Sequence, residues 1–385
     1  MNRKLKMGMI GGGPGAFIGS IHRLASTMDG EIELVAGAFS SDPSKSKQTG
    51  EHLHLSPERI YESFEDMLEK ESQMPPGVRI DLVSIVTPNY LHFKPAKLAL
   101  EKGFHVVLDK PMTLNLEEAK ALKLAAKSAG KYFCLTHTYT GYPMVKEARQ
   151  QVLSGNLGKI RKVVSTYPQG WLSTFVEGTD NKQAAWRADP AKTGIANCMG
   201  DIGTHAFNLA EYVSGLKVLA LCADINTMVR GRALDDDGAA FLKFDSGASG
   251  LLYASQIMAG EENDISIKVY GEKGGLEWKQ SDCNSLVMKW LDKPSQVLRA
   301  GSSYLSSFAK HNTRTPPGHP EGYLEAFANH YRNFALCVKA QMDDVISKEE
   351  WLDFPGIEEG VRGMAFIENA ILSGKSNNKW INFNV

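Results

Sequence analysis

The sequence predicts an α/β chain with two domains: an N-terminal doubly wound parallel sheet, and a C-terminal α/β domain with a largely antiparallel open sheet. Three observations lead to this prediction. Short apolar runs alternate with helical patterns over the first third of the chain, a glycine cluster follows the first run, and the alternation ends near Thr138. A chain of 385 residues also exceeds what one hydrophobic core normally serves. We therefore expect domains at residues 1–138 and 139–385.

The first domain is expected to contain buried strands that alternate with helices. Short apolar runs between turn signals are typical of strands covered on both faces. The clearest helix between these runs spans Leu116–Ser128, after a capping Asn115 and before Gly130, which stops it. Strands that alternate with helices predict a parallel sheet. The expected strands are Lys6–Ile10, Ile32–Phe39, Leu82–Val86, His105–Leu108 and Tyr132–Leu135.

The second domain shows a different pattern. Helices are expected over Pro143–Ser154, Asp201–Ser214, Tyr323–Lys339 and Ile357–Leu372. Between them, apolar and polar residues alternate in runs joined by short turns, which predicts antiparallel strands with one open face. Because an open face often serves as a subunit contact, we expect a homodimer or homotetramer. The expected strands are Arg161–Tyr167, Val218–Met228, Ala239–Phe244, Gly250–Gln256, Ile265–Tyr270, Leu276–Lys279 and Ser285–Trp290.

Composition and charge exclude several classes of protein. The formal net charge is -1, without the basic excess of a nucleic-acid-binding protein. No apolar run approaches the roughly 18 residues of a membrane span, and the stretch after Met1–Lys6 is too short for a secretory signal. The 5 cysteines are scattered, which indicates reduced thiols rather than a disulfide or zinc framework. We expect a cytoplasmic protein that binds a small molecule and neither nucleic acid nor membrane.

Polar or conformationally special residues follow each expected strand of the first domain. Ligands of such sheets bind beyond the carboxyl ends of the strands, so these segments are expected to meet at one edge. The sequence therefore predicts a ligand site there. The segments are Gly11–Ala16, Ser40–Ser41, Thr87–Asn89, Asp109–Pro111 and His137–Tyr139.

The glycine cluster fits the pattern G-x-G-x-x-A, with Gly11, Gly13 and Ala16 in the defining positions and Pro14 and Gly15 between them. Glycine permits a tight turn and lets the backbone approach a pyrophosphate, which then faces the positive end of the following helix. Because the cluster lies between a strand and a helical pattern, it predicts dinucleotide binding rather than an ordinary turn.

Ser40, Ser41 and Lys45 bear on the choice between NAD and NADP. NAD-specific domains usually place an acidic residue at the end of the second strand, where it binds the ribose hydroxyls. Ser40 stands there instead. The two serines and Lys45 suit a 2′-phosphate, so the sequence leans toward NADP. An ordinary turn in which Asp42 reaches the ribose of NAD remains the alternative.

Lys110, Asp201 and His205 are the candidate catalytic residues. Pro111 restricts Lys110 to an extended backbone at the ligand edge, which favours an active-site role over a solvated lysine. Asp201 and His205 are four residues apart on an expected helix, so a carboxylate there can orient an imidazole that accepts a proton. The alternatives are a plain helix cap and a core or surface histidine. A metal site that combines them with His137 has no recognisable ligand spacing, so no metal is expected.

Aromatic residues of the long loop 167–190 are candidates for substrate contact. Trp171 and Trp186 offer flat apolar faces that suit the C–H face of a sugar ring. Long ordered loops often act as lids over a ligand. The alternative is that these side chains pack the seam between the domains.

Together these motifs resemble the superfamily of glucose-fructose oxidoreductase, inositol dehydrogenase and MocA-like proteins, known as Gfo/Idh/MocA. The resemblance covers nearly the whole chain. It implies an N-terminal Rossmann domain that binds NAD or NADP, and a C-terminal α/β domain whose open sheet mediates oligomers. It also implies an oxidoreductase acting on a sugar, glycoside or polyol. The motifs are Gly11–Ala16, Thr87–Asn89 with His92, Asp109–Pro111, Trp186–Arg187 and Asp201–His205.

The resemblance also implies roles for single residues. Lys110 matches the lysine of the family's Glu-Lys-Pro motif, with Asp109 where glutamate is usual, and Asp201 and His205 match its catalytic aspartate and histidine. His137 stands where asparagine or another polar residue is common. The expected substrate contacts are Lys110, Tyr139, Trp171, Asp201 and His205. The expected cofactor contacts are Gly11, Gly13, Pro14, Gly15, Ala16, Ser40, Ser41, Lys45, Thr87, Pro88, Asn89, His92, Asp109, Lys110, His137, Trp186 and Arg187.

These expectations define a mechanism. The substrate lies over the nicotinamide between the domains, His205 removes the hydroxyl proton as a general base, and Lys110 stabilises the charge that develops on the oxygen. The roles of Lys110 and His205 are open to exchange, and Asp201 orients His205 or holds a neighbouring hydroxyl.

One alternative is a glycosidase or epimerase that works through a transient ketone on tightly bound NAD. A metal-dependent enzyme is another, and the intact catalytic set argues against a cofactor-sensing regulator.

Overall fold

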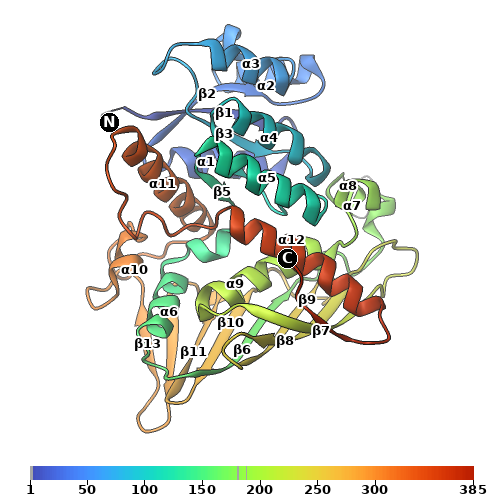
Figure 1. Cartoon of the computed structure of the whole chain (residues 1–385), viewed down its shortest axis with the longest axis vertical. Helices are drawn as coiled ribbons and strands as arrows, with labels where there is room; N and C mark the ends of the chain where they lie inside the picture. Colours follow the sequence, from blue (N-terminus) through green and yellow to red (C-terminus); the bar gives the residue numbers. More distant parts are fainter. Residues whose placement is uncertain (1–2, 180–181, 188) are drawn as a thin grey trace. The chain divides into compact units, whose positions relative to one another are not determined.

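The chain builds two sheets, one parallel and one mostly antiparallel (Figure 1). The structure, a computed structural model, describes residues 3–179, 182–187 and 189–385. Its contacts divide the chain into two units. The first consists of Met1–Thr113, Glu117–Thr138 and Leu324–Val361, and the second of Leu114–Leu116, Tyr139–Tyr323 and Arg362–Val385.

The first unit contains a parallel sheet in the order β2-β1-β3-β4-β5, which confirms the predicted fold class. The predicted strand bounds agree with the observed ones to within a residue. Because β2 and β3 flank β1, the chain leaves the sheet in opposite directions after β1 and β3, and the switch point lies between those two strands. The strands are β1 (Leu5–Gly11), β2 (Ile32–Ala38), β3 (Leu82–Val86), β4 (His105–Leu108) and β5 (Phe133–Leu135).

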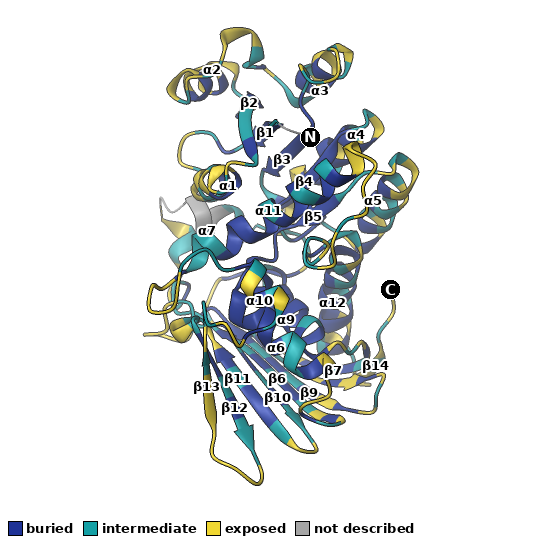
Figure 2. Cartoon of the chain, turned by 90° about the vertical axis from the view of Figure 1, so that its left-hand side faces the viewer, coloured by how far each residue is buried: buried dark blue, intermediate teal, exposed yellow. Residues whose placement is uncertain are grey.

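Helices accompany this sheet, and their outward faces are exposed on α2 and α3, whereas the strands are buried (Figure 2). Local capping explains where two of them begin. The Asp42 carboxylate caps α2, and the Ser63 hydroxyl caps α3 by accepting a hydrogen bond from Asp66 N at 3.1 Å. The helices are α1 (Phe17–Thr27), α2 (Pro43–His52), α3 (Phe64–Gln73), α4 (Phe93–Glu101), α5 (Leu116–Ala129) and α11 (Tyr323–Met342).

Nearly all of α11 belongs to the first unit, which differs from the predicted division into residues 1–138 and 139–385. The buried Tyr331 hydroxyl on this helix lies 2.7 Å from His22 Nδ1 and 2.8 Å from Ser84 Oγ. These partners are 309 and 247 positions away in the sequence. Burying polar groups requires such partners, but no local pattern reveals contacts at that separation. The chain therefore returns to the first unit at Leu324, after Tyr139–Tyr323 of the second.

The second unit contains a sheet in the order β13-β12-β11-β10-β6-β9-β8-β7-β14. Within the described part of the chain, β6 and β9 pair in parallel and the other neighbours pair antiparallel. The strands are β6 (Ile160–Pro168), β7 (Val218–Asn226), β8 (Asp237–Phe244), β9 (Ser249–Ser255), β10 (Ser266–Gly271), β11 (Gly274–Lys279), β12 (Ser285–Trp290), β13 (Gln296–Arg299) and β14 (Trp380–Asn382). Strands β13 and β14 are short edge strands that the sequence analysis did not predict.

Helices α6 (Pro143–Leu153) and α9 (Thr204–Ser214) pack on one face of this sheet (Figure 1). Buried and less buried residues alternate along β8, as expected for a sheet covered on one side. Phe241 on β8 and Leu219 on β7 are both 56% exposed.

The remaining helices are α7 (Lys182–Arg187), α8 (Pro190–Thr193), α10 (Ser307–His311) and α12 (Ile357–Lys375). Of these, only α12 was predicted, and it continues three residues past the predicted Leu372. In the described ranges, no helix has both the length and the apolar character needed to cross a membrane.

His105, at the start of β4, generates a prediction about acid stability. Its ring is buried, and Nδ1 accepts a hydrogen bond from Tyr132 N at 3.1 Å, which requires an unprotonated nitrogen. Burial, with a smaller effect from Lys131, lowers the pKa of His105 to about 3. The unfolded chain, with a histidine pKa of about 6.5, therefore takes up the proton first. This group should cost up to roughly 1.4 kcal/mol of stability per pH unit as the pH falls from about 6.5 toward 3.

We expect His105→Asn to flatten this pH dependence, because asparagine keeps an acceptor near Nδ1 but does not titrate. Urea unfolding at a series of pH values between about 6.5 and 4 measures the slope. The exposed His52 on α2 supplies the matched control, His52→Asn, which should leave the slope unchanged. Parallel curves for His105→Asn and the wild type would contradict the prediction.

Candidate functional site

The glycine cluster forms the turn between β1 and α1, where the sequence places it. Gly11, Gly12 and Gly15 have φ values of +85°, +77° and +79°, which favour glycine. A Cβ on Gly13 would lie 2.8 Å from Phe39 O, and Gly13 N donates to that same oxygen at 3.1 Å. A Cβ on Gly11 would lie 2.9 Å from Thr87 Cγ2. The turn after β1 therefore packs directly against the segments that follow β2 and β3.

Helix α1 presents its N-terminal end to this turn. Its N-cap, Ala16, makes no side-chain capping bond, and the first turn of the helix carries no acidic residue. Gly19 allows the helix to approach closely, since a Cβ there would lie 2.5 Å from Gly12 Cα. The sequence analysis missed Gly19, although its position one helical turn after Gly15 was a usable signal. The positive helix end and the glycine backbone suit a pyrophosphate.

A pocket of about 440 Å³ lies beside the turn. Its wall combines Gly12–Ala16 with Ser20 and Arg23 of α1 and Gln48 and His52 of α2. Arg23 Nη1 donates to Gly12 O at 3.0 Å, so this side chain also supports the turn. The glycine turn thus borders open space beside α1 and α2.

After β2, Asp42 takes part in several contacts. The sequence analysis had instead favoured Ser40, Ser41 and Lys45 as contacts of the cofactor. Its carboxylate accepts hydrogen bonds from Ser44 N at 3.0 Å and Lys45 N at 3.4 Å, and Lys45 Nζ lies 3.6 Å away. Ser40 Oγ accepts a bond from Asp42 N at 3.1 Å, and Ser41 lies between these two residues. The hydrogen bond from the Ser44 side chain is the main cause that lowers the pKa of Asp42. The segment therefore presents a carboxylate together with a lysine.

His92 connects the segments that follow β3 and β4. The ring is fully buried, with Nδ1 2.8 Å from Pro111 O and Nε2 2.8 Å from Thr87 O. Burial lowers the pKa of His92, although Asp109 and the two carbonyl groups act in the opposite direction. These contacts give His92 the role of holding two loops in place, which differs from the predicted contact to the cofactor. Pro88 and the buried Asn89 belong to the same loop.

Asp109 and Lys110 lie at the end of β4. Thr136 Oγ1 and Lys110 N each donate to Asp109 Oδ1 at 2.9 Å, and His22 Nε2 lies 3.9 Å away. Burial by itself raises the pKa of Asp109, but His22 and Lys110 outweigh it and hold the pKa below its usual range. The Lys110–Pro111 peptide bond is cis. Asp109 is thus a carboxylate that fixes the start of the Lys110 segment.

His137 follows β5 and completes this edge of the sheet. Its side chain is buried, and His330 Nε2 lies 3.0 Å from its carbonyl oxygen. Burial, followed by the charge of Lys110, lowers the pKa of His137 to about 3. The imidazole is therefore neutral at pH 7. Because a ring with so low a pKa is a weak base, His137 suits a hydrogen-bonding contact better than proton transfer.

Asp201 and His205 lie in the second unit, but not on one regular helix as predicted. Met199–Gly203 forms a π-helical turn, and α9 begins at Thr204. Asp201 therefore lies inside the turn and does not cap a helix; its backbone N–H donates to Asn197 O at 2.7 Å. Single π-helical turns occur frequently at functional sites.

The Asp201 carboxylate has partners on either side. Gln256 Nε2 donates to its Oδ2 at 3.0 Å, and Arg187 Nε lies 3.5 Å from the same oxygen. The Arg187 guanidinium stacks on the Trp186 ring at 4.3 Å. Trp186 and Arg187, predicted as cofactor contacts, thus belong to the surroundings of Asp201.

His205 is 7% exposed and packs against phenol rings. The Tyr139 ring meets it edge-on, with 4.8 Å between centroids and 83° between planes. The Tyr139 hydroxyl hydrogen-bonds to that of Tyr167, and Asn263 joins both, donating from Nδ2 to Tyr139 at 3.1 Å and accepting from Tyr167 at 2.6 Å. Burial raises the pKa of both tyrosines, so they stay protonated. The phenol cluster thus packs against the His205 imidazole.

Three amide residues of this site, Gln169, Gln256 and Asn263, escaped the sequence analysis. Gln169 accepts a bond from Trp171 Nε1 at 3.0 Å, so it positions a predicted substrate contact. Gln169 and Gln256 follow β6 and β9, the parallel pair, and Gln169 N donates to Ser255 O at 2.7 Å. Their places after two apolar strands were the available signal. That signal points to a shared site only once the two strands are known to run in parallel.

Among the described residues, no group of three or more His, Cys, Asp or Glu side chains is placed to hold a metal ion. The residues that the sequence analysis assigned to the cofactor and the substrate belong to two different units. The glycine turn, Ser40 to Lys45, Thr87 to His92, Asp109, Lys110 and His137 lie in the first, and Tyr139, Trp171, Trp186, Arg187, Asp201 and His205 lie in the second.

Comparisons with known proteins agree with this division. A family described as an oxidoreductase family with an NAD-binding Rossmann fold matches residues 5–137, and the GFO/IDH/MocA C-terminal domain matches residues 145–277. The uncharacterized oxidoreductase YfiI of Bacillus subtilis (strain 168) is 31% identical, over 100% of this chain and 98% of its own.

Solved structures show the same similarity over the whole chain. An inositol dehydrogenase homologue from Azotobacter vinelandii complexed with NAD+ is 34% identical, with a TM-score of 0.93 over 100% of this chain and 98% of its own. The structure of that homologue with NADH and myo-inositol gives 32% identity and a TM-score of 0.91 over the same shares. An oxidoreductase from Sinorhizobium meliloti is 41% identical, with a TM-score of 0.89 over 98% of this chain and 99% of its own. The chain therefore belongs to the Gfo/Idh/MocA family of NAD-binding oxidoreductases.

Proposed function

We propose that this protein is a dehydrogenase that oxidises a secondary hydroxyl group of a sugar, glycoside or polyol, or reduces the corresponding ketone. The observation that carries the proposal is the buried imidazole of His205, held among phenol and amide groups, in a chain that also folds a glycine cradle for a dinucleotide. Phenols, amides and the indole of Trp171 suit a neutral substrate rich in hydroxyl groups. The homologue bound to myo-inositol supports the same class of substrate.

The first unit would hold the cofactor, whose nicotinamide ring exchanges hydride with the substrate carbon. Gly11–Ala16 and the N-terminal end of α1 would bind the pyrophosphate. The Asp42 carboxylate suits the ribose hydroxyls, and the homologue complexes with NAD+ and NADH favour NAD as the cofactor. NADP, which the sequence leans toward through Ser40, Ser41 and Lys45, stays the alternative prediction.

His205 acts as the general base that takes the hydroxyl proton. Its imidazole packs against the Tyr139 ring, with 83° between the two planes, which restricts its orientation. Asp201, four residues earlier, is held by Gln256 and Arg187 and would orient His205 or hold a neighbouring hydroxyl of the substrate. Lys110, at the edge of the parallel sheet, is the predicted hydrogen-bond donor to the substrate oxygen.

The protein also forms a homodimer or homotetramer in this proposal. The exposed Leu219 and Phe241 lie on neighbouring strands of the sheet in the second unit, and exposed apolar side chains on a sheet face suit a subunit contact.

The direct test of the proposed function begins with mass spectrometry of small molecules released from the denatured protein. A panel of sugars and polyols is then offered with NAD+ or NADP+, and reduced cofactor is followed by its absorbance. We expect reduction of NAD+ with at least one polyol or sugar. Tightly retained NAD with no consumption of added cofactor would instead support a glycosidase or epimerase that regenerates its own cofactor.

Gly13→Ala tests the cofactor cradle. The added methyl group would meet Phe39 O at 2.8 Å. The methyl group would push the turn away from Phe39 and out of the shape that suits a pyrophosphate, so NADH affinity should fall roughly tenfold or more, about 1.4 kcal/mol. Gly356→Ala is the matched control, since Gly356, like Gly13, lacks a positive φ, and an added Cβ there would lie at an ordinary contact distance of 3.5 Å from Phe133 O. Fluorescence titration with NADH measures both, and equal affinities for Gly13→Ala and wild type would refute the cradle.

Lys110→Met tests the proposed hydrogen-bond donor. Removal of the ammonium group should lower kcat by roughly two to four orders of magnitude while NADH affinity is retained. Lys94→Met, at an exposed position on α4, serves as the control with the same change in side chain. Unchanged turnover in Lys110→Met would remove Lys110 from the mechanism.

A further inference from the structure

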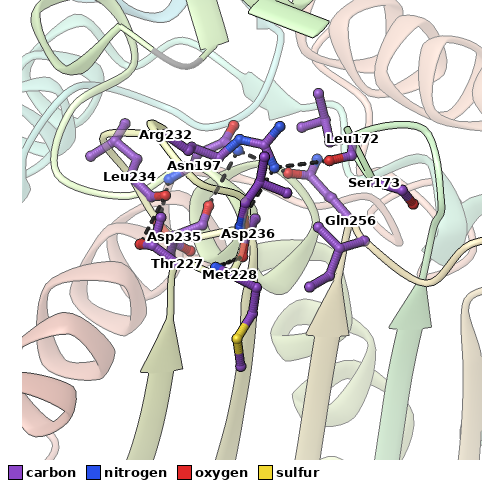
Figure 3. A network of polar contacts seen from close by, with 12 residues as sticks. Leu172, Ser173, Asn197, Thr227, Met228, Arg232, Leu234, Asp235, Asp236 and Gln256 are labelled. Carbon is purple, nitrogen blue, oxygen red and sulfur yellow. Dashed lines mark hydrogen bonds and ion pairs between the residues drawn. The ribbon is translucent and has the colours of Figure 1, made fainter. Parts of the chain in front are cut away.

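Asp235, in the loop between β7 and β8, holds the start of the π-helical turn that carries Asp201 (Figure 3). Its Oδ1 accepts a hydrogen bond from Asn197 N at 2.6 Å, and its Oδ2 accepts one from Met199 N at 2.7 Å. Its carbonyl oxygen accepts a third, from Cys198 N, at 3.2 Å. Three successive backbone N–H groups thus converge on one residue. A helical turn needs partners for its first N–H groups, and Asp235 supplies them from another loop.

The carboxylate of Asp235 stands in an environment that disfavours charge. Asp235 is 5% exposed. Burial raises its pKa to about 6, while the N–H groups of Met199 and Asn197 act in the opposite direction. Since the ionised form costs free energy here, the two short N–H contacts are what retain it.

A second connection leads from the same place to the Asp201 side chain. Asn197 Nδ2 donates to Gln256 Oε1 at 3.0 Å, and Gln256 Nε2 donates to Asp201 Oδ2 at 3.0 Å. Gln256 is fully buried, and its backbone N–H donates to Asp236 O at 2.9 Å. Asp201 is therefore fixed twice, by the backbone that Asp235 holds and by the amide of Gln256.

The neighbouring Asp236 makes the loop itself rigid. Its carboxylate accepts hydrogen bonds from Met228 N at 2.8 Å, Val229 N at 2.9 Å and Arg232 Nη1 at 3.1 Å. Arg232 is buried and pairs with Glu177, with Nε 2.7 Å from Oε1. Asp235 and Asp236 thus share burial and chemistry but hold different segments, the turn of Asp201 and their own loop.

We propose that Asp235 is a positioning residue for Asp201 and, through the π-helical turn, for His205. This inference rests on the proposed function, because it assigns to Asp235 the placement of the group that takes the substrate proton. Loss of its carboxylate should impair turnover and leave cofactor binding intact, since its contacts lie within the second unit.

The test compares Asp235→Asn with Asp236→Asn. In Asp235→Asn, an amide NH2 replaces one acceptor oxygen and opposes a backbone N–H. We expect faster hydrogen exchange in a peptide covering residues 197–203 and a fall in kcat of roughly 10- to 100-fold, as for a small misplacement of a reacting group, with NADH affinity unchanged. Asp236→Asn should speed exchange in residues 227–236 and change kcat little. Gln256→Met, which removes only the amide contacts, should also lower kcat and serves if Asp235→Asn fails to fold.

The two readouts separate the possible failures. Faster exchange at residues 197–203 with wild-type kcat would make Asp235 merely structural and overturn the proposal. Unchanged exchange in that peptide would overturn it as well. If the wild type turns over no member of the substrate panel, the proposed function fails, and with it the catalytic part of this inference. The exchange comparison then still reports whether Asp235 holds the turn.

Discussion

Parallel strand pairing is the constraint on which the arrangement of the candidate site residues in each unit depends. Parallel neighbours end at the same edge of a sheet, so whatever follows them is brought together. In the first unit, β1 and β3 bring the glycine turn against Thr87, so closely that a Cβ on Gly11 would lie 2.9 Å from Thr87 Cγ2. In the second, β6 and β9 bring Gln169 and Gln256 to one edge of an otherwise antiparallel sheet.

Buried carboxylates also stabilise the candidate site residues in each unit. Asp109 accepts bonds from Thr136 Oγ1 and Lys110 N, and Asp235 accepts two backbone N–H groups from the start of the π-helical turn. A buried carboxylate is costly unless donors surround it, and those donors are then fixed in turn. Burial raises the pKa of both carboxyl groups. At Asp109 the nearby His22 and Lys110 outweigh it, whereas at Asp235 the N–H groups of Met199 and Asn197 do not.

Sequence patterns predicted the elements better than their assembly. Apolar runs located the strands of the first sheet to within a residue, and alternation located most strands of the second. Short edge strands and short helices were missed, because their few residues carry little periodicity. The sequence analysis missed the π-helical turn because Asp201 has the residue type of a helix cap. In the structure, Asp235, in a distant loop, accepts the hydrogen bonds from the first N–H groups of the turn.

The sequence by itself determined the fold class, the glycine cradle and the identity of the catalytic candidates, because these depend on local periodicity and on short motifs. The tertiary structure alone decided that α11 returns to the first unit, that His92 links two loops, and that Gln256 and Asp235 hold the turn of Asp201. Each of these depends on hydrogen bonds between buried groups. Such bonds form only where folding brings distant segments together, as with Tyr331 and His22, 309 positions apart.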